Sequence, residues 1–215
     1  MSVNKPFRYT SQLNCTSMNA ENFFSLINGR RGHFLYESGY HSDVWFDLET
    51  LCQRPTLIRS FLLELCSDIA ATKPEVICGA LIEGAFVALL TAMELQCQFV
   101  YTLRVSEGVA GQMFGVAYEL PATLQKVVLG KRVAVVNDVI SAGSAVRGTL
   151  QSLSKAGAEI ACVGSLVVLG DSFLEFAEQQ SLSLRTLLKL PNNLWQPSLC
   201  PLCAASVPLQ RLAVQ

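Results

Sequence analysis

The chain has 215 residues, of which 51% are hydrophobic and 15% charged. That length can bury one substantial core, and the composition is far from that of a disordered chain. Lysine and arginine number 16 against 17 acidic residues, with a formal net charge of −1, so there is no global basic field that would hold nucleic acid.

The apolar stretches are too short and too interrupted to cross a bilayer. The longest, Ala85–Leu95, contains Thr91 and Glu94, whereas a membrane-spanning helix needs roughly 18 apolar residues. The opening residues MSVNKPFRYTSQLNCTS are polar throughout and lack the apolar segment of a secretory signal. These features predict a cytoplasmic protein with no membrane partner, whose scattered cysteines are reduced thiols.

Helical and strand-like segments alternate through the middle of the chain. In chain order we expect a helix from Pro55 to about Thr72, a strand at Val76–Cys78, a helix at Gly84–Leu95 and a strand at Phe99–Tyr101. The order repeats with a strand at Arg132–Val136, a helix at Ser144–Lys155 and a strand at Ile160–Val168. Such alternation predicts an α/β fold, Rossmann-like, in which helices flank a parallel sheet.

The segments around this core are less regular. Between Val105 and Lys131 the pattern lapses into glycines and a proline, which predicts a mobile or hairpin loop over a site. A helix is expected near Glu21–Asn28, followed by an extended piece, whereas residues 189–215 are rich in Pro, Asn and Ser. We expect the two ends to form a small hood lobe together, with residues 1–50 and 189–215 as its two parts and residues 51–188 as the α/β core.

One strand-to-helix junction carries the chemistry. In VAVVNDVISAGSAVRGTL a buried strand is expected to end at Asn137-Asp138, before a turn of small residues and a helix. The turn consists of Ser141, Ala142, Gly143, Ser144 and Ala145. Its small residues let backbone N–H groups approach a phosphate, and the helix N-terminus adds a favourable dipole. Asp138 would accept hydrogen bonds from ribose hydroxyls; the alternative is an ordinary turn with Asp138 as a local cap.

This segment resembles the diphosphoribosyl-binding signature of the type I phosphoribosyltransferases. Arg31–Ile58 is similar to the amino-terminal part of orotate phosphoribosyltransferases, ICGALIEGAFVALLTAMEL to their pyrophosphate loop, and Trp195–Gln210 to the closing segment of one bacterial branch. The resemblance implies an enzyme that transfers ribose 5-phosphate from phosphoribosyl diphosphate to a base, converting orotate to orotidine 5′-phosphate in pyrimidine nucleotide synthesis. It also implies Mg²⁺ bound through the diphosphate and a homodimer.

The resemblance further implies roles for individual residues. Asp138 and Asn137 would be the catalytic positions beside the ribose, and residues 141–145 would hold the 5-phosphate. The diphosphate would be bound by Gly79, Ala80 and Arg104, although Arg104 has pairing with Glu107 as an alternative.

Several positions depart from the family's pattern. Asn137 stands where the first of two adjacent acids is usual, Glu83 where Lys or Gly is frequent, and Gly170-Asp171 where an Asp-Arg pair lies near orotate. Arg104 is the only base between residues 74 and 125. An active orotate-type enzyme therefore competes with a catalytically impaired homologue that binds a nucleotide or phosphate as a regulatory module, and with a transferase for a different base.

Two cysteines near the carboxyl terminus stand apart. Cys200 and Cys203 have the spacing of half a zinc site, but the sequence has no second such pair. His33 and His41 are far away in sequence, although both join the same lobe if the termini pack together. We expect a structural turn first, with zinc or a disulfide as alternatives, and assign no metal ligands.

Overall fold

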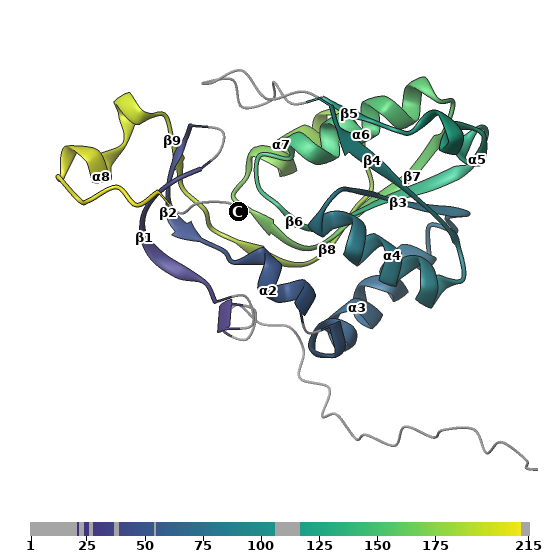
Figure 1. Cartoon of the computed structure of the whole chain (residues 1–215), viewed down its shortest axis with the longest axis horizontal. Coiled ribbons are helices and arrows are strands. Elements are labelled where there is room, and N and C mark those ends of the chain that lie inside the picture. The colour runs from purple at the N-terminus through teal and green to yellow at the C-terminus, as the bar shows by residue number, and fades with distance from the viewer. Residues whose placement is uncertain are drawn as a thin grey trace, which may run out of the picture.

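The computed structural model describes residues 21, 24–25, 28–36, 39–53, 55–105 and 117–211. Within these residues the strands form a six-stranded sheet of order β5-β4-β3-β6-β7-β8 and a three-stranded sheet of order β1-β2-β9. Figure 1 shows the small sheet standing beside one end of the larger, helix-flanked one. No helix in the described part of the chain is long and apolar enough to span a membrane.

The large sheet is parallel except at one edge. Its parallel strands are β3 (Val76–Ala80), β4 (Gln98–Arg104), β6 (Arg132–Ile140), β7 (Glu159–Leu169) and β8 (Leu184–Leu190). The short strand β5 (Tyr118–Glu119) pairs antiparallel with β4. The parallel strands share one direction, so their carboxyl ends lie along one edge of the sheet, where open α/β sheets bind ligands.

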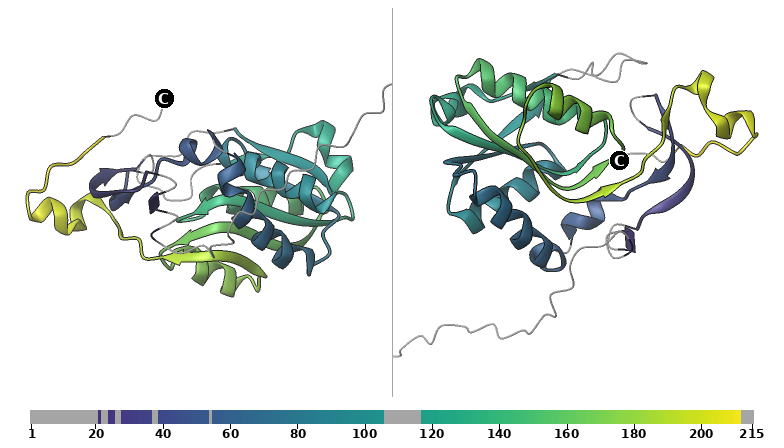
Figure 2. Two further views of the ribbon diagram at one scale, coloured as in Figure 1. Left: turned by 90° about the horizontal axis from the view of Figure 1, so that it is seen from below. Right: turned by 180° about the vertical axis from the view of Figure 1, so that it is seen from behind.

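Helices cover both faces of this sheet (Figures 1 and 2). On one face lie α2 (Leu48–Gln53), α3 (Pro55–Ala70) and α4 (Glu83–Leu95), and on the other α6 (Ser144–Lys155) and α7 (Ser172–Gln179), with η1 (Ala122–Leu124) and α5 (Gln125–Val128) beside them. In α3 the buried Ile58, Leu62, Leu65 and Ile69 recur at helical spacing. Each face therefore buries its own apolar cluster, and the expected α/β class is confirmed.

The small sheet draws on both ends of the chain. β1 (Arg30–Leu35) and β2 (His41–Trp45) form an antiparallel pair, to which β9 (Leu194–Trp195) adds on the β2 side. Beyond it lie η2 (Pro197–Leu199) and α8 (Pro201–Ala204), and Gln210 then returns to β1, where its N–H donates to the His33 carbonyl at 2.8 Å. The small hood lobe formed by the two ends is thus confirmed, and its expected domain limits stay a proposal.

Some boundaries differ from those expected. β6 continues to Ile140, so the expectation that this strand ends at Asn137-Asp138 is wrong; its last residues find partners in β7, where Ile140 pairs with Val168. β8 carried no strand prediction, and it ends two residues inside the part expected for the hood. Residues 106–116 of the expected loop, and residues 22–23 and 26–27 of the first expected helix, lie outside the described residues.

Candidate functional site

Asp138 lies near the carboxyl end of the central strand β6. Its side chain is 3% exposed, and its Oδ2 atom has no hydrogen-bond partner among the described residues. Burial raises the pKa of this carboxyl group to about 7, and the nearby charge of Glu83 adds to the rise. The site therefore holds a buried carboxyl group that has a free acceptor atom and changes charge near neutral pH.

Asn137 is fixed by its own strand and by the start of α4. Its side-chain Nδ2 donates to the Val139 carbonyl at 2.9 Å. Its Oδ1 lies so close to Gly84 that a Cβ atom there would be 1.9 Å away. This close approach requires glycine at position 84 and brings Asn137 against the first turn of α4, which also carries Glu83.

The turn of residues 141–145 depends on a glycine. Gly143 has φ +79 and is the N-cap of α6, a left-handed conformation that other residues adopt only at a cost. A Cβ atom here would also lie 2.2 Å from the Phe173 ring. α6 therefore begins abruptly at Ser144, and the N–H groups of its first turn face the end of β6, an arrangement suited to an anion.

Arg147 links this turn to α7. Its Nε donates to the Ala142 carbonyl at 3.1 Å and one terminal nitrogen donates to the Ser172 carbonyl at 3.2 Å. Its guanidinium carbon lies 3.8 Å from the centre of the Phe176 ring. The turn is thus held against α7 by a cation, which also adds positive charge close to the expected phosphate position.

Asn192, between β8 and β9, was not anticipated. Its side-chain Nδ2 donates to Ser141 Oγ at 3.3 Å, and its Oδ1 accepts a hydrogen bond from Ser42 Oγ at 2.9 Å. Ser42 belongs to β2 and is fully buried. One amide therefore ties the hood lobe to the 141–145 turn.

The remaining predicted residues lie along the same edge of the sheet. Gly79 is covered by α4, since a Cβ atom there would meet Ala88 Cβ at 2.7 Å, and Ala80 beside it is buried. The next peptide, Leu81–Ile82, is cis. Arg104 is the exposed last residue of β4, two strands from β6, or roughly 10 Å at ordinary strand spacing. The alternative partner Glu107 lies outside the described residues.

Comparison with known proteins decides the family. Residues 48–182 match the family described as phosphoribosyl transferase domain. The chain belongs to this family. An orotate phosphoribosyltransferase of Chlorobium phaeobacteroides (strain BS1) is 32% identical to this phosphoribosyltransferase over 178 residues, covering 83% of this chain and 85% of the relative. The expected kinship with orotate-type enzymes is confirmed.

Solved phosphoribosyltransferases share the fold. The orotate phosphoribosyltransferase of Aeropyrum pernix superposes with a TM-score of 0.58 at 22% identity, covering 75% of this chain and 87% of that one. The adenine phosphoribosyltransferase of Thermoanaerobacter pseudethanolicus gives 0.62 at 16% identity, covering 80% and 99%. Because proteins named for different bases superpose about equally well, the fold alone does not identify the base.

Proposed function

We propose that this phosphoribosyltransferase transfers ribose 5-phosphate from phosphoribosyl diphosphate to orotate and so serves pyrimidine nucleotide synthesis. In this reaction the bond from C1′ to the diphosphate breaks and a bond from C1′ to a ring nitrogen of orotate forms, with loss of the nitrogen's proton. The observation that carries the proposal is the buried Oδ2 of Asp138, which has no partner in the described part of the chain and lies at the same edge as the glycine-capped 141–145 turn. The relative named orotate phosphoribosyltransferase supports orotate as the base.

Two neighbouring features would hold the sugar phosphate. The turn of residues 141–145 would bind the 5-phosphate through backbone N–H groups and the hydroxyls of its serines. Asp138 would accept a hydrogen bond from a ribose hydroxyl at its free oxygen. Such a bond favours the ionised carboxylate, so binding would lower the pKa of Asp138 from about 7 and release a proton.

The same carboxylate would act on the transition state. As the diphosphate leaves, positive charge develops on the ribose ring, and a fixed negative charge nearby stabilises it. Asn137 contributes a neutral amide that is hydrogen-bonded to Val139. Of these two adjacent positions, only Asp138 would therefore supply negative charge. We therefore expect catalysis to depend strongly on whether Asp138 is ionised.

The diphosphate end would lie toward β3 and β4. Gly79, Ala80 and Arg104 lie there, with Arg104 as the cation. Bound Mg²⁺ would neutralise the diphosphate, and Glu83, whose charge reaches Asp138, offers a carboxylate oxygen of the kind that Mg²⁺ prefers. Glu83 without such a cation would repel the substrate.

A homodimer forms part of the proposal. The exposed apolar side chains Ile82, Phe86, Leu89 and Met93 follow one another at spacings of four, three and four residues, which places the last three on one face of α4, with Ile82 at its N-cap. An apolar stripe of this kind marks an association surface. Sedimentation analysis should find a dimer that Phe86→Glu converts to monomer, and a wild-type monomer would contradict this part.

The reaction is tested directly with pure protein, phosphoribosyl diphosphate and Mg²⁺. Loss of orotate absorbance is expected in the presence of all components, and Asp138→Asn should lower the rate at least about 100-fold. Adenine serves as the competing base. Turnover of adenine alone would make the chain a transferase for a different base.

The neutral Asn137 and the acidic Glu83 favour one second candidate, a homologue that binds a nucleotide without turning it over. No turnover of any base, together with measurable binding of a ribose 5-phosphate nucleotide, would replace the proposed function by this one.

A further inference from the structure

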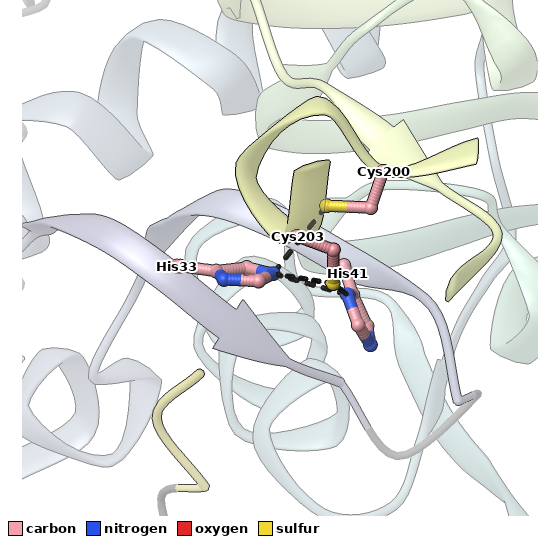
Figure 3. Close-up of side chains that lie close together, drawn as sticks. All are labelled: His33, His41, Cys200 and Cys203. Carbon is pink, nitrogen blue, oxygen red and sulfur yellow. Dashed lines mark hydrogen bonds between the residues drawn. The ribbon is translucent and has the colours of Figure 1, made fainter. Parts of the chain in front are cut away.

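Four side chains from distant parts of the chain converge in the hood lobe (Figure 3). His33 comes from β1 and His41 from β2, whereas Cys200 and Cys203 lie at the start and within α8. Their nearest nitrogen and sulfur atoms all lie within 4.8 Å of one another. From this convergence we propose that these residues bind one zinc ion, at a site separate from the carboxyl edge of the large sheet.

Four distances between these atoms are close to the edges of a zinc tetrahedron. His33 Nε2 and His41 Nδ1 are 3.0 Å apart, and Cys200 Sγ lies 3.4 Å from His33 Nε2. Cys203 Sγ lies 3.3 Å from His41 Nδ1 and 3.8 Å from His33 Nε2. Bonds of about 2.05 Å to nitrogen and about 2.3 Å to sulfur at tetrahedral angles give edges of about 3.3 Å between nitrogens and about 3.6 Å between nitrogen and sulfur.

Hydrogen bonding alone does not account for this arrangement. His33 Nδ1 lies 2.8 Å from the Val207 carbonyl, which can only accept, so Nδ1 carries the proton and Nε2 presents a lone pair. That single lone pair faces a histidine nitrogen and two sulfurs at once. A metal ion satisfies all of them together, and the Val207 carbonyl then orients the histidine ligand as outer partners in zinc sites do.

The ligand set and its surroundings indicate a structural zinc. Two thiolates and two imidazoles in a tetrahedron suit zinc and not Mg²⁺. Both histidines and Cys200 are buried, and Cys203 closes the site on the exposed side. With four protein ligands no position stays open for a substrate.

The ion would fasten both ends of the chain to each other. β9 has only two residues, Leu194–Trp195, so few ladder hydrogen bonds hold the carboxyl-terminal segment to β2, and metal ligation supplies folding energy that so small a sheet lacks. The residue after His41 is Ser42, which donates a hydrogen bond to the side chain of Asn192, and Asn192 in turn donates one to Ser141. Zinc would thereby set the position of the hood lobe over the phosphate turn.

Metal analysis of protein purified under reducing conditions tests the proposal independently of turnover. We expect about one zinc per chain, and Cys203→Ser should bind zinc at least tenfold more weakly. The matched control is Cys97→Ser: Cys97 donates to the Pro74 carbonyl at 3.3 Å in the core, a bond that serine also makes. Because Cys203 is exposed, serine there should leave the core of the large sheet folded, and circular dichroism verifies this.

Cobalt exchange reports the geometry. Wild-type and Cys97→Ser protein loaded with Co²⁺ should show intense tetrahedral ligand-field bands and a thiolate charge-transfer band, and Cys203→Ser should lose intensity in both. Folded, reduced wild-type protein that holds no stoichiometric zinc and gives no cobalt spectrum would overturn the proposal. Equal zinc affinity of the Cys203→Ser and wild-type proteins, or a Cys200–Cys203 disulfide that persists in reductant, would overturn it as well.

Discussion

Replacing Asp138 by asparagine should stabilise the folded chain at alkaline pH, although it removes the proposed catalytic carboxylate. The group is 3% exposed, and its Oδ2 has no partner among the described residues. Burial raises its pKa from 3.8 to about 7. An asparagine of the same shape removes the need to bury a charge.

The size of the effect follows from this rise in the pKa of Asp138. A shift from 3.8 to about 7, at about 1.4 kcal/mol per pH unit, corresponds to about 4 kcal/mol above pH 7. Between the two pKa values the folded state keeps a proton that the unfolded state has lost. The contribution of the protonated Asp138 to the stability of the wild type is therefore fully present below about pH 4 and is lost as the pH rises through about 7. The new amide N–H₂ group needs a hydrogen-bond partner, which reduces the benefit. The free energy of unfolding of the variant should therefore exceed that of the wild type by about 2 to 4 kcal/mol at about pH 8.

Urea unfolding followed by circular dichroism at several pH values measures this difference. The advantage of Asp138→Asn over wild type should grow by nearly 3 kcal/mol between about pH 5 and about pH 8. Asp171→Asn is the control, because it makes the same exchange at an exposed carboxylate next to the same sheet edge. A difference that is independent of pH, or a less stable variant at pH 8, would show that burial does not raise the pKa of Asp138.

Three further predictions concern the turn and its surroundings. Gly143→Ala should cost about 1–3 kcal/mol more than Gly130→Ala: both glycines have positive φ, but only at 143 would the new Cβ meet a ring, at 2.2 Å. Equal melting temperatures would contradict this. Asn192→Ala should raise KM for phosphoribosyl diphosphate severalfold, because the amide that holds the turn is lost. The control Asn193→Ala loses only an exposed hydrogen bond to a hood aspartate and should leave KM unchanged. Equal KM values for the two variants would contradict this role of Asn192. Glu83→Gln should move the acidic limb of the kcat/KM profile to lower pH, since the charge of Glu83 raises the pKa of the buried aspartate, and an unmoved limb would exclude that coupling.

Local signals in the sequence predicted the core accurately. α6 runs over Ser144–Lys155 as expected, because the preceding glycine marks its start and its amphipathic spacing continues to its end. β6 was expected to be shorter, since its last residues are set by pairing with β7, a strand of 11 residues. β8 escaped prediction because Leu184–Leu190 is rich in leucine and lacks strand alternation, so that only its pairing with β7 makes it a strand.

Some contacts of the site join residues that are far apart in the sequence, and no local sequence pattern predicts these contacts. Asn192 bonds to Ser42 across 150 positions and to Ser141 across 51, and no spacing in the sequence indicates such pairs. The Cys200-x-x-Cys203 spacing gave half of a zinc site, and the other half was visible only on the assumption that the termini pack together. The two histidines join these cysteines because β1, β2 and β9 form one sheet.

Calorimetric titration of ribose 5-phosphate into wild-type and Gly143→Ala protein isolates the binding of the phosphate by the 141–145 turn. We expect saturable binding to the wild type and at least about tenfold weaker binding to the variant, in which the left-handed N-cap of α6 is strained. Flat titrations of folded wild-type protein, or equal affinities for the two proteins, would contradict it.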